Sequence, residues 1–195
     1  ETDNALDIHI DKGKGAKTAL IYDSPITGGK SKHSYKELRD KVSKFAGALS
    51  NQGISKGDRV IIYMPMIPEA VYAMLACARI GAIHSVVFGG FSIESLKDRI
   101  LDSDCTAVVT ANEGIRGGKL VPLKNNVDEA LKDCPNVHSV IVVNRTESAL
   151  INKNEVDVDY YEDIENFDKD CPCEEMNAED PLFILYTSGS TGKPK

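Results

Sequence analysis

The 195 residues of this sequence suffice for one α/β domain with a sizeable core. Hydrophobic residues make up 42% of it and charged residues 27%, which is ordinary for a soluble globular protein. The net charge of -7 argues against a surface built for nucleic acid or membranes, and the longest apolar run, residues 70–78, is far too short to span a bilayer. A local basic patch for a phosphorylated ligand stays compatible with this charge.

Both ends of the chain suggest a piece of a longer protein. The chain begins with Glu1 rather than Met, and Lys195 falls inside an unfinished motif. We therefore expect residues 1–195 to be a partial N-terminal domain, truncated at both ends. The first ten residues carry acids and no apolar signal region, so we expect a cytoplasmic protein, and an organellar targeting segment upstream of residue 1 stays open.

The cysteines do not form a metal-binding pattern. Their number is odd, no CxxC occurs, and only four His accompany them. We expect reduced thiols, no metal ligands, and a small core residue at Cys77. The five cysteines are Cys77, Cys105, Cys134, Cys171 and Cys173.

The first predicted elements surround a well-marked helix start. We expect a strand over residues 18–23 and a turn over residues 25–32. Ser34 can then cap a helix that begins at Tyr35, with Glu37 at the third helical position, as in a capping box. The helix has one apolar stripe and ends near Gly53; the stripe consists of Leu38, Val42, Phe45 and Leu49.

From residue 58 onward, strands and helices alternate. Pro68 suits the first turn of a helix, Gly81 its end, and Ser92 the cap of the next helix. Residues 145–179 are acidic and weakly periodic, so we expect a surface excursion with one short helix near YYEDI. The predicted strands cover residues 58–64, 82–88, 105–111, 138–144 and 181–187, and the predicted helices cover 69–80, 93–102 and part of 120–134.

This alternation predicts an α/β fold with a largely parallel sheet and helices on both faces. In such sheets, ligands bind at loops beyond the carboxyl ends of the strands. Three loops of this kind carry suitable residues: 88–91, 112–119 and 187–195. By contrast, His84 on an apolar strand is expected to be a satisfied core histidine, and the acidic run 155–170 a solvated face.

The loop TSGSTGKPK (187–195) has the chemistry of an anion site. It holds four hydroxyls, two glycines and two lysines, and no group that titrates near neutral pH. Such a loop can hold phosphate through backbone N–H groups, hydroxyls and positive charge, which suits triphosphate chemistry. It is not a Walker A loop, because only two residues separate its glycines and Pro194 follows Lys193. On composition alone, a flexible Ser/Gly/Thr hairpin is the alternative.

The loop 112–119 places Arg116 and Lys119 on either side of Gly117 and Gly118. Two cations around a compliant turn can meet a phosphate-rich nucleotide, and Arg offers a planar fork. From the residues alone, a solvated turn with basic flanks is the plainer interpretation.

In the loop 88–91, Gly89 and Gly90 allow a ligand to approach the backbone, and Phe88 or Phe91 can cover an adenine face. The plainer interpretation here is a tight strand-to-helix turn with core aromatics.

The stretch YTSGSTGKPK (186–195) resembles the phosphate loop of the adenylate-forming superfamily, which includes acyl-CoA synthetases, luciferases and the adenylation domains of peptide synthetases. All ten residues fit this long motif. Residues 63–92, residues 112–131 and the opening NALDIHI look like the matching stretches of short-chain acyl-CoA synthetases, so the resemblance covers essentially the whole chain. The pattern is most similar to the AMP-forming acetyl-CoA synthetases, with propionyl-CoA synthetases as close relatives.

This resemblance implies roles for the three loops. It implies that Phe88, Gly89 and Gly90 lie near the adenine and phosphates of coenzyme A, and that Arg116, Gly117, Gly118 and Lys119 help to hold its nucleotide end. The family often has Arg where Lys119 stands, so the bidentate fork is lost at that position. The residues implied to wrap the β- and γ-phosphates of ATP are Thr187, Ser188, Gly189, Ser190, Thr191, Gly192, Lys193 and Lys195.

The implied reaction has two steps. A carboxylate such as acetate attacks the α-phosphorus of ATP to give acyl-adenylate and pyrophosphate, and the thiol of coenzyme A then releases AMP. Mg²⁺ neutralises the phosphates. The family's catalytic lysine and acyl pocket lie beyond residue 195, so we expect no catalytic residue within the chain and no activity from it alone. No nucleic-acid or membrane partner is expected, and the oligomeric state stays open.

Three alternatives remain at this point. The first is a propionyl-CoA synthetase. The second is a non-catalytic nucleotide-binding module without the downstream parts, and the third is a structural fragment with no ligand.

Overall fold

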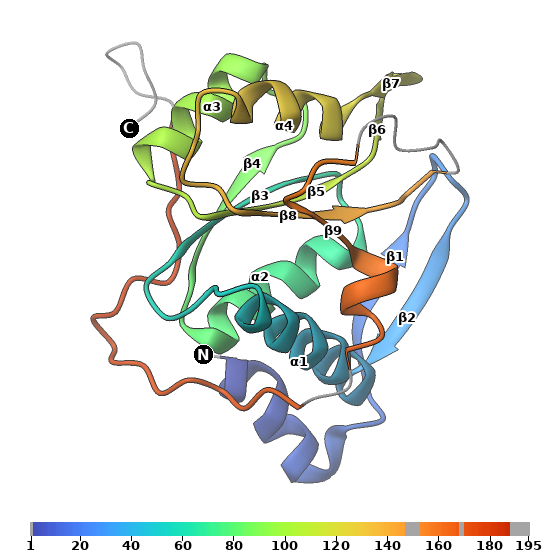
Figure 1. Ribbon diagram of the computed structural model, residues 1–195. Helices are drawn as coiled ribbons and strands as arrows, with labels where there is room; N and C mark the ends of the chain where they lie inside the picture. Colours follow the sequence, from blue (N-terminus) through green and yellow to red (C-terminus); the bar gives the residue numbers. More distant parts are fainter. Residues whose placement is uncertain (1, 147–152, 168–169, 188–195) are drawn as a thin grey trace.

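The computed structural model describes residues 2–146, 153–167 and 170–187. Its centre is a five-stranded sheet in the order β4-β3-β5-β8-β9, in which every neighbouring pair is parallel. Two antiparallel pairs, β1 with β2 and β6 with β7, stand apart from this sheet (Figure 1). The strands are β1 (Thr18–Asp23), β2 (Lys30–Ser34), β3 (Arg59–Met64), β4 (Ile83–Phe88), β5 (Ala107–Ala111), β6 (Gly114–Arg116), β7 (Lys119–Val121), β8 (Ser139–Val143) and β9 (Asp157–Asp159).

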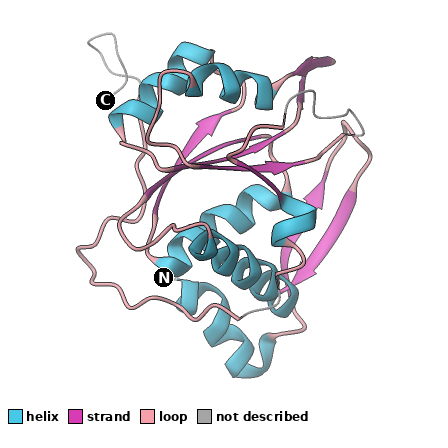
Figure 2. Ribbon diagram, in the orientation of Figure 1, coloured by secondary structure: helices cyan, strands magenta, loops and turns pink. Residues whose placement is uncertain are grey.

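Helices cover both faces of the central sheet (Figure 2). α1 (Tyr35–Asn51) packs against α2 (Pro68–Ile80) on one face, and α3 (Ile93–Asp102) packs against α4 (Leu123–Leu131) on the other. None of the described helices is long and apolar enough to cross a membrane. The parallel sheet with helices on both faces confirms the predicted α/β fold. Short helical turns complete the described chain at Asp3–Asp7, Ile10–Lys14 and Tyr160–Ile164.

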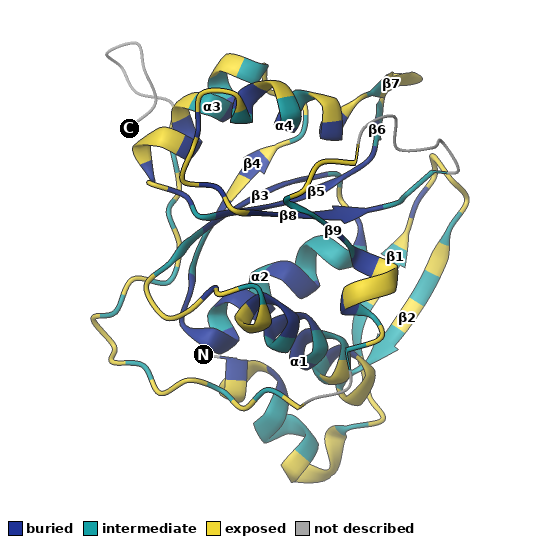
Figure 3. Ribbon diagram, in the orientation of Figure 1, coloured by how far each residue is buried: buried dark blue, intermediate teal, exposed yellow. Residues whose placement is uncertain are grey.

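The core lies between the sheet and its two helical layers (Figure 3). All residues of β5 and β8 are buried, as expected for parallel strands covered on both faces. Cys77 of α2 is fully buried, as predicted, and all five cysteines are free thiols.

The predicted helix boundaries are confirmed where local chemistry marks them. The backbone N–H of Glu37 donates to Ser34 Oγ at 3.2 Å and that of Ser34 donates to Glu37 Oε2 at 2.7 Å, which is a complete capping box. Pro68 opens α2, and Gly81 ends it in the left-handed conformation with φ of 73°.

The strand order creates a switch point at β3. The chain runs from β3 through α2 to β4 on one side, and then returns through α3 to β5 on the other side of β3. Because crossovers between parallel strands are right-handed, these opposite directions place α2 and α3 on opposite faces. A crevice opens at the carboxyl ends of strands where such a reversal occurs. Loops 88–91 and 112–119 follow β4 and β5 at this position.

Four short strands were not predicted. β2 lies partly in the predicted turn and β9 in the acidic stretch 145–179. β6 lies in the predicted loop 112–119, and β7 runs from the end of that loop into the stretch predicted to contain a helix. Polar residues dominate β2, and β6, β7 and β9 have three residues each. Strands this short or polar show no hydrophobic period, so their pairing depends on the partner strand rather than on their own sequence.

The predicted strand over residues 181–187 is wrong in extent. Only Phe183 forms a bridge, parallel to His84, with the N–H of Ile184 donating to the carbonyl of His84 at 2.9 Å. Phe183 and Leu185 stay more than half exposed on the outer side of β4. The segment follows the edge of the sheet without a continuous ladder.

The acidic run 155–170 is not simply a solvated face. Tyr160 and Ile164 are buried, and the ring of Tyr160 meets Phe45 of α1 edge to face at 5.5 Å. Asp157 forms a buried ion pair with Lys124 at 2.8 Å. The apolar and paired residues within the run attach it to the domain, although its overall composition is acidic.

His84 is not the satisfied core histidine that was expected. Its Nδ1 is buried and has no hydrogen-bond partner among the described residues. Burial lowers the pKa of His84, so its imidazole is neutral at pH 7.

Candidate functional site

A cleft of about 520 Å³ lies at the switch point of the sheet. The carboxyl ends of β3 and β4 and the β6–β7 hairpin contribute to its wall. The end of β1 with the loop after it, Leu123, Arg145 and Leu185 complete it. Four of the predicted coenzyme A residues line it: Phe88, Gly89, Gly90 and Arg116. Residues from two separate predicted loops therefore meet in one cleft.

Arg116 and Phe88 form the most specific contact in this cleft. The guanidinium carbon of Arg116 lies 5.0 Å from the centroid of the Phe88 ring, within the range of a cation–π interaction. Both side chains are exposed to solvent. An exposed ring beside a planar cation can stack on an aromatic base and pair with a phosphate.

Gly90 allows this contact to form. A Cβ at position 90 would lie 2.6 Å from the Phe88 ring and would collide with the Arg116 guanidinium. Gly89 has more room, since a Cβ there would lie 3.3 Å from Leu123. Any side chain at position 90 would displace Arg116 or the ring of Phe88.

The hairpin β6–β7 carries the remaining predicted coenzyme A residues. Gly117 and Gly118 form its two-residue turn with φ of 55° and 75°, as a type I′ turn requires. Arg116 and Lys119 are paired across the strands, so the two cations lie side by side at the tip. The glycines serve the turn geometry, and neither they nor Lys119 line the cleft.

Tyr63 supports the loop that follows β4. It is fully buried in β3, and its hydroxyl donates to the carbonyls of Gly89 and Phe91, at 3.3 and 3.1 Å. Asn126 Nδ2 donates to the same hydroxyl at 3.2 Å. Burial raises the pKa of Tyr63, so the hydroxyl stays protonated and keeps its donor role.

Sequence reasoning missed several residues of the cleft. Arg145, the second residue after β8, lines it, and its Nε is buried without a hydrogen-bond partner among the described residues. Its position beyond the carboxyl end of a parallel strand was the available signal. Met66, the second residue after β3, carried the same signal, whereas Tyr22, Ile26 and Leu185 come from segments without it.

A second pocket of about 430 Å³ lies among β2, α2 and the Tyr160–Ile164 turn. Glu69 lines it beside Tyr72 and Tyr161, and His33 meets Tyr72 edge to face at 5.9 Å. Burial raises the pKa of Glu69 and also raises that of Tyr161, to about 12. No sequence pattern predicted this pocket.

The predicted phosphate loop lies outside the described residues from Ser188 to Lys195, and Thr187 is the last residue described. Thr187 is exposed. Tyr186, directly before it, donates its hydroxyl hydrogen to Asp102 Oδ2 at 2.7 Å. The segment that leads into the loop is thus attached to α3.

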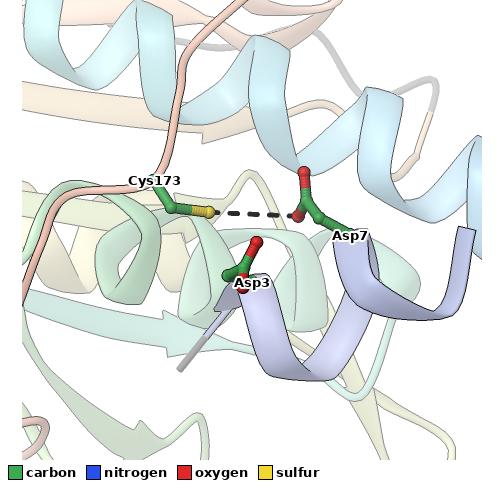
Figure 4. A group of neighbouring side chains, drawn as sticks. All are labelled: Asp3, Asp7 and Cys173. Atoms are coloured by element: carbon green, nitrogen blue, oxygen red, sulfur yellow. Dashed lines mark hydrogen bonds between the residues drawn. The ribbon is translucent and has the colours of Figure 1, made fainter. Parts of the chain in front are cut away.

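Within the described part of the chain, Asp3, Asp7 and Cys173 form the one group with converging ligand atoms, all within 4.8 Å of one another (Figure 4). This group does not suit a cation. Asp7 already accepts hydrogen bonds from Arg79 at 2.8 and 3.0 Å and from Arg39 at 3.2 Å. Magnesium prefers oxygen ligands in octahedral geometry, which two carboxylates and a thiol do not offer. None of the three lines the cleft.

Burial by itself would raise the pKa of Asp7, but the hydrogen bonds and charges of Arg79 and Arg39 outweigh it and lower this pKa. Asp7 therefore serves as the anion of a partly buried ion-pair network that holds the Asp3–Asp7 turn on α1 and α2.

Comparison with known proteins agrees with this architecture. Residues 9–195 match the family model described as "AMP-binding enzyme". The chain is 55% identical over 192 residues to acetyl-coenzyme A synthetase 2 of Pseudomonas aeruginosa, and 57% identical over 192 residues to acetyl-coenzyme A synthetase of Parvibaculum lavamentivorans. Each match covers 98% of this chain and 30% of the relative.

A solved structure has the same fold. It is described as acetoacetyl-CoA synthetase from Streptomyces lividans, with a TM-score of 0.86 and 27% sequence identity. The match covers 99% of this chain and 29% of that one, so the chain spans under a third of the relatives that it matches. Because the family model covers nearly the whole sequence, this chain belongs to the AMP-binding enzyme family.

Proposed function

We propose that this chain is the front part of the large N-terminal domain of an AMP-forming acetate–CoA ligase. The whole enzyme activates acetate with ATP to acetyl-adenylate and pyrophosphate, and then transfers the acetyl group to coenzyme A. The observation that carries the proposal is the identity of about 55% over nearly the whole chain to relatives named acetyl-coenzyme A synthetase. Five free thiols fit a reducing compartment, so the cytoplasm is the proposed location.

The chemistry of the switch-point cleft supports a role in binding the nucleotide end of coenzyme A. Phe88 offers an exposed ring for adenine, and Arg116 offers a planar cation for phosphate. Gly90 leaves the space in which Arg116 meets the ring of Phe88. Lys119 adds a second positive charge at the tip of the hairpin.

Residues 187–195 are the proposed cradle for the β- and γ-phosphates of ATP. Hydroxyls, glycine backbone and two lysines supply hydrogen bonds and charge without any acid–base group. When bound, Mg²⁺ would neutralise phosphate charge. The one group of converging ligand atoms among the described residues, Asp3, Asp7 and Cys173, does not fit that ion.

Pyrophosphate exchange by the full-length protein that carries this chain tests the activity. We expect exchange of labelled pyrophosphate into ATP that depends on acetate, with propionate supporting it less well. Faster exchange with propionate would favour a propionyl-CoA synthetase. Failure of both acids would contradict the proposed activity.

Calorimetric titration of the chain Glu1–Lys195 with coenzyme A tests the cleft. We expect Arg116→Met to weaken binding by roughly fivefold, because about 1 kcal/mol of cation–π and phosphate interaction is lost. Lys132→Met, a change at an exposed cation outside the cleft, is the matched control and should bind like the wild type. We also propose that catalysis needs segments of the enzyme beyond Lys195. Acetate-dependent pyrophosphate exchange by the chain Glu1–Lys195 alone would contradict this.

A further inference from the structure

Arg99 of α3 lies between two aromatic rings from segments that are far apart in the sequence. Its guanidinium carbon is 4.8 Å from the centroid of the Phe91 ring and 5.2 Å from that of the Tyr186 ring. Phe91 ends the loop 88–91, and Tyr186 immediately precedes Thr187. One buried cation therefore joins the segments that lead into both proposed substrate sites.

The contacts continue from Phe91 to the cleft. The ring of Phe91 meets that of Phe88 edge to face, with 5.7 Å between their centroids. The guanidinium carbon of Arg116 lies 5.0 Å from the centroid of the Phe88 ring. We call this series the aromatic–cation stack; its members in order are Arg116, Phe88, Phe91, Arg99 and Tyr186. It extends without a gap from the β6–β7 hairpin to the start of the predicted phosphate loop.

α3 anchors the stack at two points. Arg99 is only 7% exposed, and its Nη1 donates to the carbonyl of Ser95 one turn earlier at 2.7 Å. Tyr186 donates to Asp102 Oδ2 at 2.7 Å, so its ring is held at both its face and its hydroxyl. A cation–π contact is stronger when it is shielded from water, as the burial of Arg99 implies.

The stack also replaces an absent backbone ladder. Residues 181–187 follow the edge of β4 with one bridge, at Phe183. Among the described residues, the backbone of Tyr186 forms no hydrogen bond with a strand. Side-chain contacts to α3 therefore help to position Tyr186. Without Arg99, Tyr186 would lose the cation–π contact to its ring and keep the hydrogen bond from its hydroxyl to Asp102.

We propose that Arg99 is a positioning residue that fixes Tyr186 and Thr187, which lead into the proposed phosphate loop, against the coenzyme A loop, residues 88–91. It acts through Tyr186 and Phe91 and touches no substrate itself. The inference rests on the proposed function, because it assigns substrates to these two loops. Its consequence is that binding of ATP and of coenzyme A both depend on one side chain of α3.

Steady-state kinetics of the full-length protein tests this inference. We expect Arg99→Met, which keeps much of the volume but removes the cation, to raise the KM for ATP about tenfold, equivalent to about 1.4 kcal/mol. The KM for coenzyme A should rise by a smaller factor and the KM for acetate should stay unchanged. Arg99→Lys retains the charge and should recover part of the loss.

Lys97→Met is the matched control on the same helix. Lys97 is ion-paired with Asp133 at 3.2 Å and takes no part in the stack, so this variant should keep the wild-type KM values. A purely structural role for Arg99 would lower the melting temperature or kcat and leave the KM for ATP unchanged. If the KM for ATP is unchanged while the wild type catalyses acetate-dependent exchange, the inference is overturned and the proposed function is unaffected.

Tyr186→Leu keeps the test decisive if Arg99→Met fails to fold. It removes the ring over Arg99 together with the hydrogen bond to Asp102, so we expect the KM for ATP to rise about tenfold, with kcat nearly unchanged. An unchanged KM for ATP in this variant would count against the inference. Absence of acetate-dependent exchange in the wild type would instead overturn the proposed function, and the inference with it.

Discussion

Replacing Lys124 by Met should destabilise the domain far more than the loss of an ordinary surface ion pair. Lys124 is the second residue of α4 and is 2% exposed, and its Nζ lies 2.6 Å from Asp128 Oδ1 and 2.8 Å from Asp157 Oδ2. Asp157 is 3% exposed. In Lys124→Met the aliphatic stem is largely kept, so the change isolates the charge and leaves two carboxylates facing each other without a cation.

The expected loss is about 3 kcal/mol in the free energy of unfolding. Removing one partner of a buried ion pair costs about 3–5 kcal/mol, because the other partner remains buried and charged. The lower end applies here, since Asn154 Nδ2 also donates to Asp128 at 2.8 Å and Asp128 is less deeply buried than Asp157. With a urea m value of about 3 kcal/mol/M, the unfolding midpoint should fall by about 1 M.

Urea unfolding of the chain, followed by circular dichroism, measures this difference. Lys132→Met is the matched control. Lys132 directly follows α4 and pairs with Glu129 of that helix, and both side chains are more than half exposed. It should cost about 0–1 kcal/mol. The double variant Lys124→Met/Asp157→Asn should be less destabilised than the sum of its single variants. If Lys124→Met costs no more than Lys132→Met, the argument that this ion pair is buried and strong is refuted.

Three further substitutions test the burial of Glu69, the close packing around Gly90 and the cap of α1. Burial raises the pKa of Glu69 above 4.5, so the folded state binds its proton more tightly than the unfolded chain and stability falls as pH rises from 4.5 through the raised pKa. Glu69→Gln should therefore be more stable than the wild type at about pH 8 and no more stable at about pH 4, as urea midpoints at both values would show. Gly90→Ala should displace Arg116 and weaken coenzyme A binding roughly fivefold by calorimetry, whereas Gly89→Ala should have less effect; equal effects would contradict the contact geometry. Ser34→Ala should lower the free energy of unfolding by about 1 kcal/mol, measured by urea unfolding, because it removes the capping box of α1; no change would mean that the cap is replaced by solvent.

The elements that were predicted correctly are those with local signals. The start of α1 depends on a hydrogen bond between Ser34 and Glu37, three residues apart, and the end of α2 depends on the left-handed conformation of Gly81. Strands β3, β5 and β8 are apolar except for Arg59, Thr110 and Ser139, and such runs are typical of parallel strands that helices cover on both sides. Each of these features can be recognised from a few consecutive residues.

The elements that were missed depend on distant partners. The β6–β7 hairpin was expected to be a loop, although its Gly117-Gly118 turn has the composition of a type I′ hairpin. β9 is held by β8 and by the ion pair between Asp157 and Lys124, neither of which has a pattern in the acidic run itself. An acidic composition therefore concealed an attached segment.

The candidate site was predicted in part. The strand-end rule pointed to the loops 88–91 and 112–119, and the structure brings Phe88, Gly89, Gly90 and Arg116 from these loops into one cleft. The same rule also pointed to Met66 and Arg145, which the sequence prediction left out. The roles of these residues and of the phosphate loop remain predictions that the proposed experiments test.

By itself, the sequence determined the fold class, the helix boundaries and the chemical character of three loops, because these follow from hydrophobic period and from interactions within one turn of chain. Only the tertiary structure decided the strand order, the cleft at β3 and the aromatic–cation stack. Arg99 illustrates the difference: in the sequence it is a charged residue on an amphipathic helix, with nothing to mark it. Its position between Phe91 and Tyr186 arises only when chain segments almost a hundred residues apart are brought together by the sheet.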